Sequence, residues 1–159
     1  MSNLSCVKDQ VALVTGGTQG IGLSCAQRLL AEGAKVAIVG RNDSVGAQAL
    51  SKLKQISNDV LFIQGDCTLE ADVNRVIATL MSQWHAIHIL VNCAGGFLAK
   101  PKVEDLAMTD WERGIQWNLT SSFLALKAVV PHMKKIAYGR IVNVSSVAGR
   151  AGVATAPID

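Results

Sequence analysis

The chain has 159 residues, of which 50% are hydrophobic and 17% are charged. This length suffices for one domain with a core that needs no disulfide or metal, and we expect a single domain over residues 1–159. The net charge of +3 arises from 15 basic and 12 acidic residues spread along the chain, and aromatic residues make up 4%. The composition excludes a disordered chain or a coiled coil, and it argues against nucleic acid as a partner.

The four cysteines lie far apart and form no CxxC motif or pairing with histidine; they are Cys6, Cys25, Cys67 and Cys93. Such spacing fits neither a disulfide framework nor a zinc site, so we expect reduced thiols and no bound metal. The first ten residues lack the apolar segment of a signal peptide, and polar residues or glycine interrupt every apolar run. We therefore expect a cytoplasmic protein with no membrane association.

Short apolar runs alternate with amphipathic stretches along the chain. The apolar runs predict strands at 11–14, 36–39, 60–63, 87–91 and 140–144. The stretches between them predict helices at 21–31, 44–56, 69–84 and 109 to 131 or 133. Thr68 is expected to cap the third helix, and Thr109 with Glu112 to form a capping box on the fourth. This order predicts a doubly wound parallel α/β sheet that binds ligands at the carboxyl ends of its strands.

The first predicted strand runs directly into a glycine-rich turn, Thr-Gly-Gly-Thr-Gln-Gly-Ile-Gly at residues 15–22, and then into a helix. Backbone N–H groups and the positive helix end would face the occupant of this turn, and a diphosphate is expected there. Gly16 would turn the chain, Gly20 would let backbone approach the pyrophosphate, and Gly22 would let the helix pack closely on the strand. The alternative is a tight turn without a ligand. A P-loop is excluded because no Gly-Lys-Ser/Thr follows at the required spacing.

The Gly-x-x-x-Gly-x-Gly spacing and four further motifs resemble the short-chain dehydrogenase/reductase family over essentially the whole chain. The further motifs are Asp66, Asn-Cys-Ala-Gly at 92–95, Asn118 and Asn-Val-Ser-Ser at 143–146. The resemblance implies a Rossmann-like sheet with strand order 3-2-1-4-5. It also implies an oxidoreductase that moves hydride between a nicotinamide cofactor and a carbonyl or secondary alcohol, such as a 3-oxoacyl thioester, a sugar or a steroid.

The end of the second predicted strand bears on the choice of cofactor. An acidic residue there would hold a free ribose 2′-hydroxyl, whereas a 2′-phosphate favours arginine. Gly40 occupies the acidic position and Arg41 follows it. Because guanidinium is well suited to phosphate, we expect NADP(H) rather than NAD(H). The alternative is a solvated Arg41, with Asn42 and Asp43 completing a turn.

The resemblance also implies which residues contact the cofactor. Asp66 would hold the adenine amino group, Cys67 would offer its backbone, and the 92–95 turn would pack against the ribose and steady the sheet. The expected cofactor residues are Gly16, Thr18, Gln19, Gly20, Ile21, Gly22, Arg41, Asn42, Asp66, Cys67, Asn92, Ala94 and Gly95. Asp66 could instead stabilise the turn at 65–68. Cys93 has no evident histidine partner, which argues against a catalytic thiol.

Two residues are expected to act in catalysis. Ser146 precedes Val-Ala-Gly, the pattern that follows the family's catalytic serine, so the resemblance places that role on Ser146 rather than Ser145. Its hydroxyl would polarise the substrate carbonyl. Asn118 resembles the helix asparagine that anchors a water in the family's proton relay. Alternatively, Asn118 could satisfy a distortion of its helix.

The family's acid/base is the tyrosine of a Tyr-x-x-x-Lys motif, which would be expected at or just after residue 159. Tyr138, the single tyrosine, precedes Ser146 and has no lysine four residues later. We therefore expect the N-terminal portion of a homodimeric or homotetrameric reductase. Alone it should bind NADP(H) with little turnover, because a general acid typically contributes ~10²–10⁴-fold. The alternatives are a truncated, non-catalytic nucleotide-binding or interaction protein and, less favoured, a methyltransferase.

Overall fold

A computed structural model describes residues 7–96 and 102–149. Its centre is a parallel sheet of five strands in the order β3-β2-β1-β4-β5, which confirms the predicted architecture and strand order. The strands are β1 (Val11–Thr15), β2 (Lys35–Gly40), β3 (Val60–Gln64), β4 (Ile89–Asn92) and β5 (Arg140–Asn143). The helices are α1 (Gly20–Ala31), α2 (Asp43–Lys54), α3 (Glu70–Trp84), α4 (Met108–Ile115) and α5 (Ser121–Lys135), with short helical turns η2 (Val103–Asp105), η3 (Gln116–Thr120) and η4 (Val147–Gly149).

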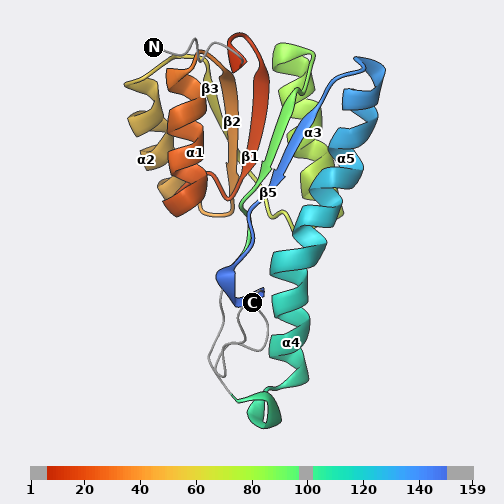
Figure 1. Cartoon of the computed structure of the whole chain (residues 1–159). Coiled ribbons are helices and arrows are strands. Elements are labelled where there is room, and N and C mark those ends of the chain that lie inside the picture. Colours follow the sequence, from red (N-terminus) through yellow and green to blue (C-terminus); the bar gives the residue numbers. More distant parts are fainter. Residues whose placement is uncertain (1–6, 97–101, 150–159) are drawn as a thin grey trace.

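Helices cover both faces of the sheet, with α1 and α2 on one side and α3 and α5 on the other (Figure 1). The alternation of side chains along β1 divides the core between these faces. Val11 and Leu13 pack with residues of α3 and α5, whereas Ala12 and Val14 pack with residues of α1 and α2. Every residue of β1 is buried, as expected for a central strand of a doubly wound sheet.

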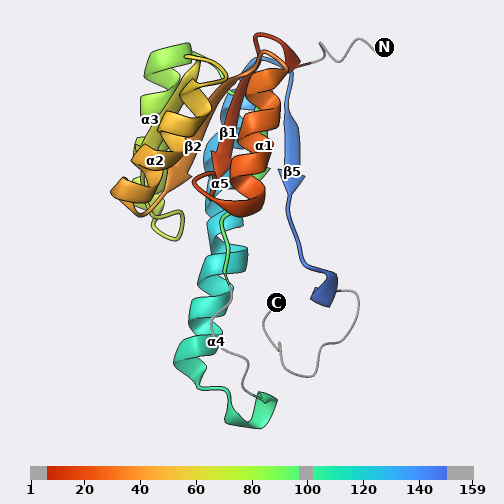
Figure 2. The same cartoon turned by 90° about the vertical axis from the view of Figure 1, so that its left-hand side faces the viewer.

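One edge of the sheet is exposed, and one helical rod extends beyond the sheet. β5 forms one edge, and its apolar side chains are exposed, with Val142 at 51%. The rod made by α5, η3 and α4 extends past the carboxyl ends of the strands, so α4 lies beyond the sheet (Figures 1 and 2). Among the described residues, no helix combines the length and the apolar character needed to cross a membrane.

The structure corrects both predicted helix caps. Helix α3 has Leu69 at its N-cap position, and no side chain caps it. The backbone N–H and hydroxyl of Thr68 instead donate to Asp66 Oδ1, at 2.9 and 2.8 Å. Helix α4 begins at Met108, so Thr109 already lies inside its first turn and forms no capping box. Thr68 bonds to the Asp66 carboxylate instead of capping α3, and helix periodicity does not reveal this contact.

The sequence predicts one continuous fourth helix, but the structure interrupts it. Residues 116–120 form a π-helical turn, η3, between α4 and α5, and Asn118 lies within it. The helix then continues through Pro131 and ends at Lys135. A π-helical turn inside an α-helix re-aims the side chains around it and is often found at functional sites. The residues on either side of Asn118 are therefore candidates for a functional site.

Candidate functional site

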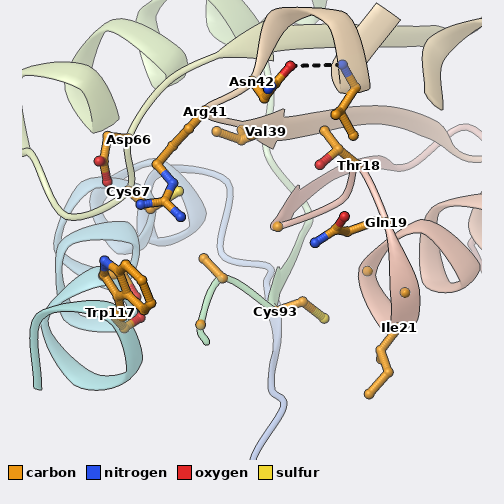
Figure 3. Close-up of a pocket in the computed structure, with 18 of the residues that line it drawn as sticks. Thr18, Gln19, Ile21, Val39, Arg41, Asn42, Asp66, Cys67, Cys93 and Trp117 are labelled. Carbon is orange, nitrogen blue, oxygen red and sulfur yellow. Dashed lines mark hydrogen bonds between the residues drawn. The ribbon is translucent and has the colours of Figure 1, made fainter. Parts of the chain in front are cut away.

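A cleft of about 400 Å³ lies at the carboxyl ends of the strands, where a doubly wound sheet binds its ligands (Figure 3). All of the expected cofactor residues except Asn92 line it. The lining residues are Gly16, Thr18, Gln19, Gly20, Ile21, Gly22, Val39, Gly40, Arg41, Asn42, Val45, Asp66, Cys67, Thr68, Cys93, Ala94, Gly95, Trp117, Ser121 and Val144. Val39 and Gly40 lie at the end of β2, and the other residues lie in the segments that follow the five strands, including the starts of α1 and α2, η3 and the start of α5.

The glycine-rich turn forms one wall of the cleft. Gly16 has a φ of +62°, and a Cβ there would lie 2.7 Å from the carbonyl oxygen of Cys93. Gly20 has a φ of +53°, but a Cβ there would meet no atom within 4 Å. A Cβ at Gly22 would collide with the carbonyl of Gly16, so this glycine lets α1 approach the residue that directly follows β1.

The first turn of α1 retains backbone donors on the cleft side. Gln19 occupies the N-cap position with extended backbone, and its side chain accepts no capping hydrogen bond. The first turn also contains no acidic residue. An uncapped helix start presents N–H groups and the positive end of the helix dipole, which together favour an anion.

Thr15 joins the turn after β1 to the turn after β4. Its Oγ1 accepts hydrogen bonds from the backbone N–H groups of Cys93, at 3.2 Å, and Ala94, at 3.1 Å. Thr15 is only 3% exposed, so these bonds are shielded from water. They hold the backbone of residues 93 and 94 against Gly16 and thereby shape the middle of the cleft.

Asn92 lies in the sheet rather than in the cleft. Its side chain is 2% exposed, and Nδ2 donates to Asn143 Oδ1 at 2.9 Å, which links β4 to β5. Asn92 Oδ1 has no hydrogen-bond partner among the described residues. This position agrees with the expectation that the 92–95 turn steadies the sheet, whereas the expected contact with a cofactor receives no support from the cleft lining.

Arg41 and Asn42 leave β2 in different directions. Asn42 Oδ1 accepts the N–H of Val45 at 3.0 Å and caps α2, so the turn anticipated for this residue begins a helix (Figure 3). The Arg41 side chain crosses the cleft, and its guanidinium carbon lies 5.0 Å from the centre of the Trp117 ring. Arg41 is therefore directed into the cleft rather than simply solvated.

Asp66 and Cys67 form the side of the cleft that follows β3. Both hydrogen bonds from Thr68 end on Oδ1 of Asp66, so this carboxylate stabilises the turn while it also lines the cleft. Burial, and then the nearby Asp66 carboxylate, raise the pKa of the Cys67 thiol to about 12. Cys67 therefore stays a neutral thiol at physiological pH.

The Cys93 thiol is also held in its neutral form. Burial, and then the adjacent Cys25 thiol, raise the pKa of Cys93 to about 11. A reactive cysteine needs a lowered pKa, so the environment of this side chain is the opposite of that of a catalytic thiol. Among the described residues, no three His, Cys, Asp or Glu side chains are grouped as metal ligands would be.

Asn118 exchanges two hydrogen bonds with the loop after β4. Its Oδ1 accepts the N–H of Gly96, and its Nδ2 donates to the carbonyl of Gly96, each at 3.0 Å. A Cβ at Gly95 would lie 2.7 Å from the same Oδ1, so a larger residue there would displace the Asn118 amide from its bonds to Gly96. Asn118 thus lies in a helix distortion, but its amide bonds to Gly96 rather than to the distorted helix backbone, and it anchors the end of the 92–96 loop.

Ser146 lies outside the cleft lining. It is exposed, and its Oγ accepts the N–H of Ala148 at 3.2 Å at the start of η4. Val144 is the cleft residue nearest to it in sequence. The described residues therefore place the two expected catalytic side chains, Ser146 and Asn118, on segments next to the cleft rather than in its wall.

Sequence reasoning missed Trp117 and Ser121 as cleft residues. Both lie at the π-helical turn, where the Ser121 hydroxyl donates to the Trp117 carbonyl at 2.6 Å. The available signal was a tryptophan directly before Asn118 in a chain with only three tryptophans. Such a large side chain beside a motif residue could have been considered as part of the site.

Comparison with known proteins identifies the family. The sequence profile described as short chain dehydrogenase matches residues 10–158, and the chain belongs to this family. The chain is 37% identical over 143 residues to a 3-alpha-(or 20-beta)-hydroxysteroid dehydrogenase of Mycobacterium tuberculosis, covering 90% of this chain and 54% of the relative. It therefore spans about half the length of that protein.

Two solved structures show the same fold. An NAD⁺-bound xylitol dehydrogenase superposes with a TM-score of 0.92 at 32% identity, over 95% of this chain and 58% of that one. An actinorhodin polyketide ketoreductase variant with NADPH superposes with a TM-score of 0.89 at 31% identity, over 93% and 57%. The resemblance seen in the motifs is thereby confirmed at the level of family and fold, with neighbours that carry either dinucleotide.

Proposed function

We propose that this protein is an NADP(H)-dependent oxidoreductase that transfers hydride between the nicotinamide and a carbonyl or secondary alcohol. The choice of cofactor rests on a single observation, the arrangement of Gly40 and Arg41 at the end of β2. Arg41 extends into the cleft, and a Cβ at Gly40 would lie 2.6 Å from the Thr18 side chain. An acidic side chain that selects a free 2′-hydroxyl would therefore displace Thr18, whereas a guanidinium is already present for a phosphate.

The residues of the cleft fit a dinucleotide in the proposed arrangement. The uncapped start of α1 and the open space at Gly20 would accept the diphosphate, and Arg41 would bind the 2′-phosphate. Asp66 would hold the adenine amino group beside the backbone of Cys67. Bound there, the nicotinamide would supply or take up the hydride.

The catalytic roles are proposed on Ser146 and Asn118. The Ser146 hydroxyl would donate a hydrogen bond to the substrate oxygen and stabilise the charge that develops on it. Asn118, through the loop that it anchors, would hold a water for proton transfer. The similarity to a hydroxysteroid dehydrogenase makes a cyclic secondary alcohol one candidate substrate, beside sugars and 3-oxoacyl thioesters.

An oligomer is also proposed, as a homodimer or homotetramer. Its support is a set of exposed apolar side chains on the rod of α4, η3 and α5, where Met108, Leu119 and Phe123 are 67%, 63% and 57% exposed. Side chains of this kind gathered on one structural element favour association with another surface. Light scattering that finds a monomer at micromolar concentration would contradict this part of the proposal.

The proposal is tested by titrating the protein with NADPH and with NADH. Arg41→Ala should weaken NADPH binding by about 10- to 150-fold, the equivalent of ~1.5–3 kcal/mol for a charge-assisted hydrogen bond, with a clearly smaller loss for NADH, which lacks the 2′-phosphate. Arg28→Ala is the matched control, because Arg28 pairs with Glu32 on α1 and does not line the cleft. Equal losses for both dinucleotides would refute the role of Arg41. NADPH binding without oxidation against a broad carbonyl panel would favour a nucleotide-binding protein without catalysis.

A further inference from the structure

Trp117 forms the wall of the cleft opposite the end of β2. Its indole is half-buried and lines the same cleft as Arg41, Asp66 and Cys67 (Figure 3). The Ser121 hydroxyl bonds to the Trp117 carbonyl and so holds the backbone from which the indole extends. A Cβ at Gly96 would lie 2.9 Å from the indole ring, so the ring packs closely against the backbone of this glycine. The indole therefore forms an aromatic surface at the proposed adenosine end of the cleft.

Arg41 lies over this surface from the other side of the cleft. The distance of 5.0 Å from its guanidinium carbon to the ring centre falls within the ~6 Å range of cation–π contacts. Arg41 is exposed, and it takes part in no ion pair among residues 7–96 and 102–149. Its charge and its planar face are thus both available to a ligand that enters between the two side chains.

We propose that Trp117 and Arg41 form a two-sided stacking site for the adenine ring, an inference that rests on the proposed function. For a flat base to fit between them, the guanidinium and the indole must lie about 7 Å apart, twice the ~3.5 Å contact distance. The present 5.0 Å gap must therefore widen by about 2 Å. The exposed arginine can make this movement more easily than the half-buried indole, which packs against Gly96. A guanidinium stacks on bases with its face and binds phosphate with its edge, so Arg41 can still reach the 2′-phosphate.

The stacking site makes Trp117 a determinant of binding for the adenosine half of the cofactor alone. Replacing an aromatic residue that stacks on a base typically weakens binding by roughly 5- to 150-fold. The nicotinamide half has no contact of this kind to lose. This difference separates a stacking residue from one whose replacement disturbs the whole cleft.

The test measures binding of NADPH, 2′,5′-ADP and reduced nicotinamide mononucleotide to wild-type chain, Trp117→Ala and Trp117→Phe. Trp117→Ala should weaken NADPH and 2′,5′-ADP within that range and leave the mononucleotide unchanged, whereas Trp117→Phe should keep most of the affinity. Trp111→Phe is the matched control, because Trp111 is 40% exposed on α4 and lies outside the cleft lining. In addition, 2′,5′-ADP should quench tryptophan fluorescence in the wild type and in Trp111→Phe but not in Trp117→Phe.

The outcomes separate the inference from the function on which it rests. Wild-type affinity of Trp117→Ala for NADPH would overturn the stacking site and leave the proposed function standing. Equal losses of all three ligands would show a structural role and would also overturn it. A wild-type chain that binds no dinucleotide would overturn the proposed function and this inference together. Loss of folding in Trp117→Ala, detected by circular dichroism, would pass the decision to Trp117→Phe and to its fluorescence response.

Discussion

Gly16 and Gly20 offer a direct test of how the glycine-rich turn works, because they share a backbone conformation but differ in their surroundings. Both have φ in the left-handed region, at +62° and +53°. Alanine costs about 1–2 kcal/mol in that region, and the cost should be similar at the two positions. Any further difference between Gly16→Ala and Gly20→Ala must come from what the new methyl group meets.

The surroundings predict a larger loss of stability at Gly16. A Cβ there would lie 2.7 Å from the carbonyl oxygen of Cys93 and 2.9 Å from the nitrogen of Ala94. Both are backbone atoms held by Thr15, so they cannot move away cheaply, and overpacking of this kind costs about 1–3 kcal/mol. Gly16→Ala should therefore lower the free energy of unfolding by about 2–5 kcal/mol, against about 1–2 kcal/mol for Gly20→Ala.

Urea unfolding followed by circular dichroism measures both variants. A loss of 1 kcal/mol corresponds to about 2–4 °C in Tm for a chain of this length, which gives an independent check. Gly20→Ala should in addition weaken NADPH binding, because its methyl group points into the open space proposed for the diphosphate. Equal destabilisation by the two substitutions would refute the packing argument. Wild-type NADPH affinity of folded Gly20→Ala would refute the placement of the diphosphate.

Three further predictions concern the groups around the cleft. Thr15→Val should lower the free energy of unfolding by about 1–3 kcal/mol because it leaves the N–H groups of Cys93 and Ala94 without their acceptor. The control Thr79→Val, at an exposed position, should lower it by under ~0.5 kcal/mol. Equal urea midpoints for the two variants would contradict this prediction. The folded chain keeps the Cys67 thiol protonated above its ordinary pKa of 9.0, so stability present below pH 9 should be lost as pH rises toward 12, and Cys67→Ala should reduce that slope. At pH 8.5, iodoacetamide should modify Cys67 and Cys93 far more slowly in the folded chain than in urea, and equal rates by peptide mass spectrometry would contradict the burial argument.

The local pattern of the sequence was sufficient to predict the elements of the sheet. Continuous apolar runs such as residues 11–14 can be buried only between two layers, and the alternation of runs with amphipathic stretches leaves few ways to arrange them. The glycines at 16 and 20 marked the turn because a positive φ is a local backbone requirement, and Gly22 marked it because it lies against Gly16, only six residues earlier. The strand order came from the resemblance in the motifs rather than from periodicity.

Only the tertiary structure decided which side chains share the cleft. Asn92 and Asn143 pair inside the sheet, and Asn118 reaches across 22 positions to Gly96. Arg41 meets Trp117, which lies in the π-helical turn between α4 and α5, far from β2 in the sequence. Each of these contacts joins elements whose relative placement depends on how the helices pack on the sheet. A local pattern records which face of an element is apolar, but it does not record which distant residue will lie opposite a polar or aromatic side chain.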